Sequence, residues 1–84
     1  MAKTLFKNGK GEIHFGVNAP EGFVSAGKSD AEKSLSKLGK MKLWRCSVCN
    51  DMHIGLKPPH ECPTCHQIES YVEINEKEFR VVIG

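Results

Sequence analysis

The chain has 84 residues, enough for one small domain with a modest core, so we expect a metal to contribute to its stability. Hydrophobic residues make up 39% of the chain and the formal net charge is +2. The longest apolar run is Val81-Val82-Ile83, which predicts neither a membrane span nor a signal-peptide core. We therefore expect a cytoplasmic monomer that has no membrane contact.

Charge is unevenly distributed along the chain. Residues 1–43 hold eight lysines against four acidic residues, whereas residues 44–84 hold four basic residues against six acidic ones. Because nucleic-acid affinity depends largely on clustered Lys and Arg, the acidic second half argues against a nucleic-acid surface there.

The first half of the chain predicts a hairpin followed by a short helix. Residues 4–7 and 12–17 are β-like runs, and the Asn8-Gly9-Lys10-Gly11 segment between them favours a turn. Ser29 and Glu32 have capping-box spacing, which predicts a helix beginning at Ser29. Its apolar face would carry Ala31, Leu35 and Leu38, and Gly39 fits a left-handed helix end.

The second half reads as a separate, mostly-β unit. Residues 43–45 are expected to form a strand that ends at the first cysteine pair. Residues 70–75 show a strand-like alternation of side-chain types, and residues 79–83 form a last β-like run. We therefore predict two segments: an N-terminal segment over residues 1–42, with a hairpin and a short helix, which need not be fully ordered, and a metal-binding domain over residues 43–84.

Four cysteines form two Cys-x-x-Cys pairs, Cys46/Cys49 and Cys62/Cys65, with twelve residues between the pairs. Thiols stay reduced in the cytoplasm, so these pairs favour metal ligation over disulfides. The alternative is a pair of redox dithiols of the thioredoxin type, but the strand-helix-strand pattern that accompanies such a motif is absent from the sequence.

The spacing within each pair predicts a metal knuckle, a tight turn that aims two sulfur atoms at one point. Backbone N–H groups in such a turn face the sulfurs and stabilise thiolate charge. The residue after each pair often needs a left-handed backbone; Asn50 suits that position, and His66 suits it less well. Four sulfurs make a closed tetrahedral site, which fits a structural zinc ion or a one-electron iron centre and leaves no position for a substrate.

The residues around the cysteines resemble a rubredoxin domain, in the short-loop form found at the C-terminus of rubrerythrins. The resemblance covers about residues 43–75 and rests on Trp44-Arg45-Cys46-Ser47-Val48-Cys49, Gly55, Pro58-Pro59, Cys62-Pro63-Thr64-Cys65 and Tyr71-Val72-Glu73-Ile74. It implies that the metal-binding domain predicted over residues 43–84 has a small rubredoxin-like or zinc-ribbon-like fold with a short antiparallel sheet. It also implies an Fe(Cys)₄ centre that carries single electrons between iron(II) and iron(III).

Some residues depart from the family pattern. Asn50, Met52, His53 and His66 stand where rubredoxins commonly have other residues. The Glu-x-x-His motif of the rubrerythrin di-iron bundle does not occur in this sequence, so we expect no enzyme activity from this chain.

The remaining candidate residues are assigned ordinary roles. With four cysteines sufficient, we expect His14, His53, His60 and His66 to lie at the surface or beside the ligands rather than to bind metal. We expect Trp44 to pack beside the site, together with Tyr71 and Phe79.

The sequence thus predicts a one-electron carrier in which Cys46, Cys49, Cys62 and Cys65 bind one iron ion, and whose partner is an oxidoreductase. The alternative is a structural zinc ribbon, with one zinc ion, that mediates protein or nucleic-acid binding.

Overall fold

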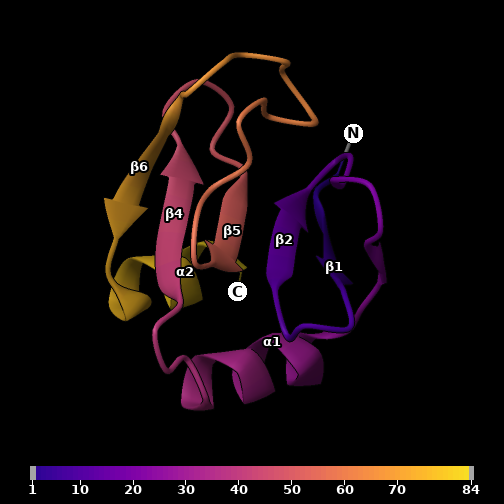
Figure 1. Cartoon of the computed structure of the whole chain (residues 1–84), viewed down its shortest axis with the longest axis vertical. Helices are drawn as coiled ribbons and strands as arrows, with labels where there is room; N and C mark the ends of the chain where they lie inside the picture. The colour runs from indigo at the N-terminus through magenta and orange to yellow at the C-terminus, as the bar shows by residue number, and fades with distance from the viewer. Residues whose placement is uncertain (1, 84) are drawn as a thin grey trace.

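The computed structural model describes residues 2–83, which form an antiparallel sheet with two helices (Figure 1). The strands are β1 (Thr4–Lys7), β2 (Ile13–Gly16), β3 (Val24–Ser25), β4 (Lys42–Cys46), β5 (Met52–Gly55) and β6 (Tyr71–Ile74). The helices are α1 (Lys28–Ser36) and α2 (Glu76–Ile83). The expected small, mostly-β fold with an N-terminal hairpin and a short helix is confirmed.

The two halves of the chain share one sheet, whose strand order is β3-β1-β2-β5-β4-β6. The joint lies between β2 and β5, where Ile13 is opposite Ile54 and Phe15 is opposite Met52. The N-terminal hairpin therefore continues the sheet of the cysteine-bearing half, and the two segments predicted as residues 1–42 and 43–84 share this one sheet.

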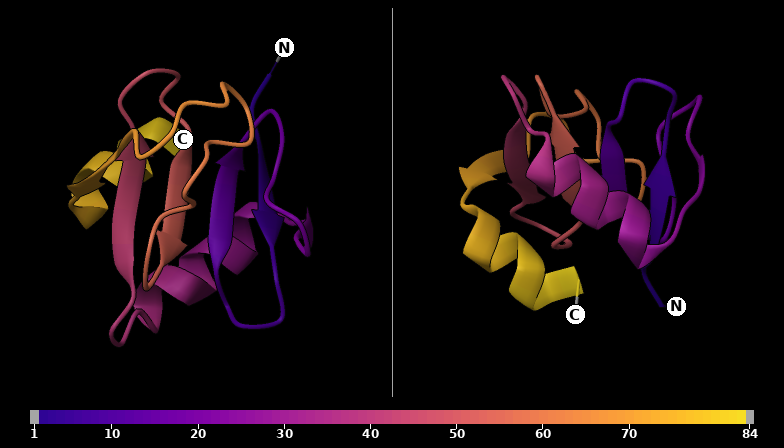
Figure 2. Two further views of the ribbon diagram at one scale, coloured as in Figure 1. Left: turned by 45° about the horizontal axis from the view of Figure 1, so that its top comes forward. Right: turned by 90° about the horizontal axis from the view of Figure 1, so that it is seen from below.

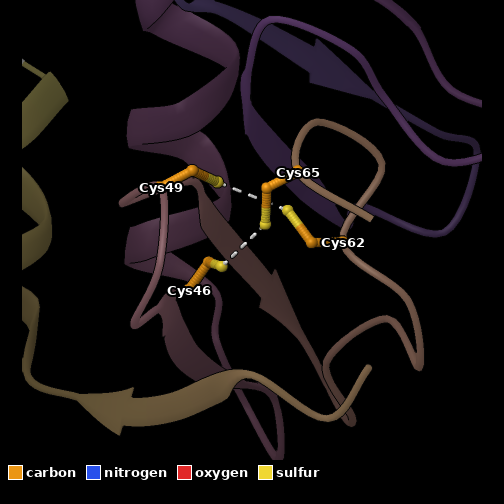
Figure 3. A group of neighbouring side chains, drawn as sticks. All are labelled: Cys46, Cys49, Cys62 and Cys65. Atoms are coloured by element: carbon orange, nitrogen blue, oxygen red, sulfur yellow. Dashed lines mark hydrogen bonds between the residues drawn. The ribbon is translucent and has the colours of Figure 1, made fainter. Parts of the chain in front are cut away.

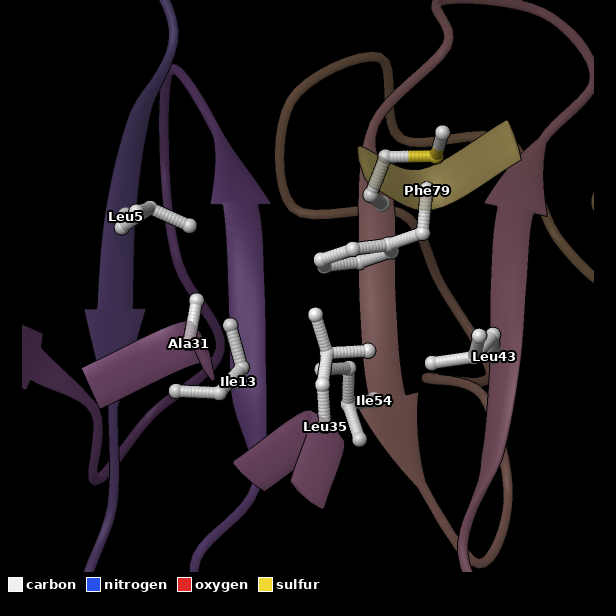
Figure 4. Packing of buried hydrophobic residues seen from close by; sticks show 8 residues of the cluster. Leu5, Ile13, Ala31, Leu35, Leu43, Ile54 and Phe79 are labelled. Atoms are coloured by element: carbon white, nitrogen blue, oxygen red, sulfur yellow. The ribbon is translucent and has the colours of Figure 1, made fainter. Parts of the chain in front are cut away.

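One face of the sheet carries the hydrophobic core. Ile13, Ile54 and Leu43 follow one another in register across β2, β5 and β4, so their side chains point to the same face. Both helices cover this face, because Leu35 of α1 and Phe79 of α2 join the same buried cluster (Figures 2 and 4). The buried members are Leu5, Ile13, Ala31, Leu35, Leu43, Met52, Ile54 and Phe79.

Helix α1 begins earlier than the sequence predicted. Its cap is Gly27, whose backbone N–H donates to the Asp30 carboxylate at 3.0 Å, so Asp30 takes the role that we assigned to Glu32. The Ser29–Glu32 spacing is present but lies inside the helix. The left-handed backbone expected at Gly39 is observed, with φ 57°.

The last element is a helix, and the β-like run predicted for residues 79–83 is wrong. Asn75 accepts a hydrogen bond from the Glu78 backbone N–H at 2.8 Å, as a helix cap does, and Glu76 pairs with Arg80 one turn later. Phe79 is fully buried while Val81 is exposed, so burial, not the β propensity of the valines, determines the structure here.

Within residues 2–83, neither helix has the length and apolar character that crossing a bilayer requires.

Candidate metal centre

The structure brings together the four cysteines that the sequence singled out. Cys46 ends β4 and Cys49 follows in the next turn, while Cys62 and Cys65 lie in the loop between β5 and β6. Their sulfur atoms all lie within 4.8 Å of one another (Figure 3). Across the two pairs, Cys46 Sγ is 3.6 Å from Cys65 Sγ and Cys49 Sγ is 3.4 Å from Cys62 Sγ.

The two knuckles have the same backbone geometry. In the first, the Asn50 N–H donates to the Cys46 carbonyl at 3.0 Å; in the second, the His66 N–H donates to the Cys62 carbonyl at 2.8 Å. Asn50 and His66 both have a left-handed backbone, with φ 66° and 64°. The conformation expected at Asn50 is thus present, and His66 adopts it as well.

One further backbone hydrogen bond closes each knuckle, and the two bonds are equivalent. The Cys46 N–H donates to the Asp51 carbonyl at 2.7 Å, and the Cys62 N–H donates to the Gln67 carbonyl at 3.0 Å. Asp51 and Gln67 therefore hold matching backbone positions, although the Asp51 side chain is buried and Gln67 is exposed.

The surroundings favour thiolate at one cysteine in particular. Burial raises the pKa of Cys46, but hydrogen bonds from Ser70 and from the backbone N–H groups of Cys49 and Val48 outweigh it and lower this pKa to about 6. The Ser70 hydroxyl lies 3.1 Å from the Cys46 sulfur. Burial raises the pKa values of Cys49 and Cys62, and the neighbouring sulfurs raise that of Cys49 further. Deprotonation of all four cysteines would therefore require a cation among them.

The sulfur positions fit such a cation. A metal–sulfur bond of about 2.3 Å in a tetrahedron places neighbouring sulfurs about 3.8 Å apart. The observed separations of 3.4 and 3.6 Å, with a maximum of 4.8 Å, lie around that value. A four-sulfur donor set suits zinc and iron alike, so the cluster supports a bound metal ion without selecting between them.

The site is closed on one side and open on the other. Cys46 and Cys62 are fully buried, whereas Cys49 and Cys65 are half-buried. Val48, inside the first knuckle, is 58% exposed. The metal position is therefore nearest to solvent at the second cysteine of each pair.

The aromatic side chains are not grouped as the sequence predicted. Phe79 lies in the core on the opposite face of the sheet from Cys46, and the Trp44 indole N–H donates to the Gly55 carbonyl at 3.1 Å. Tyr71 is opposite Cys46 in register, and its hydroxyl is buried near Cys62. Burial and the adjacent Cys62 raise the Tyr71 pKa.

The four histidines fall into two groups. His60 and His66 are exposed, and His66 pairs with Glu61 at 2.9 Å. His14 and His53 are buried, and their Nδ1 atoms lie 3.2 Å apart. Burial, with a smaller contribution from His14, lowers the pKa of His53 to about 3, so His53 is neutral in the folded protein.

Sequence reasoning missed a buried polar cluster beside the cysteines. Asp51 is fully buried, and its carboxylate contacts Lys3, His14 and Thr64. One signal was available in the sequence: His14 and His53 each stand between two apolar residues of a β-like run. Because side chains alternate between the two faces of a strand, both histidines are expected on the face opposite the core, where this cluster lies.

Comparison with known proteins agrees with the geometry. Residues 44–73 match the family model described as the rubrerythrin, rubredoxin-like domain. A protein of Methanocaldococcus jannaschii named "Putative rubrerythrin" is 30% identical over 59 residues, which are 70% of this chain and 29% of that protein. The chain thus spans less than a third of the length of this relative. No solved structure matches the chain.

Residues 44–73 are therefore a rubredoxin-like domain of the rubrerythrin type, as the motif pattern predicted. The observed fold extends this domain, because the N-terminal hairpin adds strands to its sheet.

Proposed function

We propose that this chain is a rubredoxin-type one-electron carrier in which Cys46, Cys49, Cys62 and Cys65 hold one iron ion. The observation that carries the proposal is the closed cluster of four sulfurs within a rubredoxin-like domain. Bound iron would supply the chemistry, cycling between iron(III) and iron(II) with one electron and no change of ligands.

The protein's own groups prepare the site for this cycle. Two matching knuckles hold the four sulfurs within 4.8 Å of one another, and backbone N–H groups of Val48 and Cys49 stabilise negative charge on Cys46. Because four sulfurs complete a tetrahedron, this arrangement supports electron transfer rather than catalysis at the metal. We therefore propose a carrier and not an enzyme.

The sulfurs of the half-buried residues Cys49 and Cys65 give the proposed electron path. We propose that an oxidoreductase docks over these sulfurs and the exposed Val48, where the metal position lies nearest to solvent. A reduced partner would give one electron to iron(III), and the resulting iron(II) would pass it to an oxidised acceptor. A cytoplasmic location is proposed on the basis of four free thiols.

Metal identity tests the proposal. The chain should be expressed with iron in excess, purified in air, and examined by metal analysis and visible absorption. We expect one iron per chain, a red colour from thiolate-to-iron charge transfer, and reversible bleaching by a one-electron reductant. A colourless protein with one zinc per chain under these conditions would contradict the proposal and support the zinc ribbon. Because zinc binds thiolates more tightly than iron(II), zinc found without added iron would not decide the question.

A further inference from the structure

Asp51 is an ionic centre that links the two halves of the chain. Its side chain has no exposed surface, and Lys3 Nζ lies 2.6 Å from Oδ1. The Thr64 hydroxyl donates to Oδ2 at 2.5 Å, and His14 Nε2 lies 3.2 Å from the same oxygen. Hydrogen bonds from Lys3 and Thr64, with His14 beside them, surround the Asp51 carboxyl group with donors, as an ionised carboxylate requires.

This carboxylate lies against a metal ligand. Asp51 Oδ2 is 3.7 Å from Cys62 Sγ. Once Cys62 is a thiolate it has no proton to donate, so two negative groups then face each other at that distance. Positive charge nearby stabilises such an arrangement, and the Lys3 ammonium adds to the charge that a bound metal ion would supply.

Lys3 also contacts the other knuckle. Its Nζ donates to the Cys49 carbonyl at 2.5 Å as well as to Asp51. The chain near β2 makes a further contact, since the Asn18 N–H donates to the Thr64 hydroxyl at 3.2 Å. Residues from the N-terminal hairpin region therefore reach both knuckles.

The backbone of β2 leaves space for this carboxylate. A Cβ atom at Gly16 would overlap the Asp51 side chain, so the strand can approach only because that residue is glycine. The equivalent residue of the second knuckle, Gln67, is exposed. The buried charge is thus specific to the first knuckle and not a general property of the turn.

From this geometry we infer that Lys3 and Asp51 are a positioning and charge-setting pair for the metal centre, so that the N-terminal segment helps to set its reduction potential. The inference rests on the proposed function. Reduction adds one negative charge to the centre; a carboxylate beside Cys62 opposes that addition and the Lys3 ammonium favours it. Removing Asp51 charge should raise the potential, and removing Lys3 charge should lower it.

The test is voltammetry on the iron-loaded full chain with Asp51→Asn, Lys3→Met and the double variant. We expect shifts of opposite sign in the two single variants and a potential near the original value in the double variant. Lys3→Arg should retain most of the original potential. Gln67→Glu changes charge at the matching backbone position but on an exposed side chain, and should shift the potential least.

A role limited to structure would move both single variants in one direction, and that result would overturn the inference. So would a Lys3→Met potential equal to the original, a comparison that remains valid if Asp51→Asn does not fold.

Failure of the proposed function would be recognised by a different observation, the absence of the red iron protein. If the red iron protein does not form, the same variants are loaded with cobalt(II) and their thiolate-to-cobalt charge-transfer bands are recorded. We expect a move to higher energy in Asp51→Asn and to lower energy in Lys3→Met, because the charges act on the Cys62 electrons directly. Bands that do not move, or that move together, refute the inference whichever metal is native.

Discussion

Asn50 and His66 follow the two cysteine pairs at equivalent positions, and both have a left-handed backbone, with φ 66° and 64°. Each donates its N–H to the carbonyl of the first cysteine of its pair, at 3.0 and 2.8 Å. The left-handed conformation is therefore a requirement of the knuckle itself. Asparagine tolerates it better than histidine does.

Replacing His66 by glycine should stabilise the protein. Glycine removes a steric cost of roughly 1–2 kcal/mol, from which the entropy of a more flexible unfolded chain subtracts about 0.5–1 kcal/mol. The lost pair with Glu61 is exposed and contributes little. We expect the free energy of unfolding, measured by denaturant titration of the metal-loaded protein, to rise by up to about 1.5 kcal/mol.

The matched control is His60→Gly. His60 is also exposed but has no left-handed backbone, so glycine there should destabilise the protein. If both glycine variants lose stability equally, the backbone of His66 carries no strain that glycine relieves.

The knuckles were predictable because their chemistry is local. The Cys-x-x-Cys spacing, Asn50 and the flanking motif specify the turn within a few residues, and the structure has the sulfur cluster where that spacing placed it. The hairpin was predictable for the same reason, since its turn residues lie between two short apolar runs.

Long-range contacts were not predictable from one sequence. Lys3 reaches Asp51 across 48 positions, and nothing in the residues near either one specifies that pair. The C-terminal helix was missed for a related reason: Val81-Val82-Ile83 has high β propensity, but the buried contact of Phe79 with the core decides the conformation.

Phe79 should be among the most important residues for stability. It is fully buried between α2 and the sheet, so Phe79→Ala should lower the free energy of unfolding by about 3–5 kcal/mol. Val81 lies on the same helix and is 74% exposed, so Val81→Ala should change it by no more than about 0.5 kcal/mol. Circular dichroism with denaturant titration measures both. Similar small losses in the two variants would mean that α2 does not dock on the sheet.

Stability should fall on acidification partly because of His53. Its pKa is about 3 in the folded protein, below the 6.5 of the unfolded chain, so below pH 6.5 the unfolded state binds the extra proton. The stabilising contribution of neutral His53 is complete above pH 6.5 and is lost progressively as the pH falls toward 3. The slope from this one group approaches about 1.4 kcal/mol per pH unit within that window.

Denaturant unfolding of the metal-loaded protein between pH 7 and pH 5 checks this contribution. The His53→Gln variant has no proton to gain at this position, so its stability should depend less steeply on pH. Visible absorption recorded in parallel separates acid-induced metal loss, which affects both proteins. Parallel pH profiles would show that His53 is not kept neutral by burial.

Metal loss should affect the two knuckles more than strands β1 and β2. Cys62→Ser removes one of four ligands, and metal binding is coupled to folding in such sites, so we expect loss of the metal and of the charge-transfer absorption. Amide hydrogen exchange should become roughly 100-fold faster in both knuckles, as expected for loss of a ligand whose free concentration was about 100 times its dissociation constant.

The hydrophobic core lies on the other face of the sheet and contains no cysteine ligand, so amides of β1 and β2 should lose less protection. Ser47→Ala is the control, because its exposed hydroxyl donates to the Ser70 carbonyl at 2.8 Å and not to a cysteine sulfur. A Cys62→Ser protein that keeps one metal per chain and unchanged exchange would show that the four sulfurs do not share one ion.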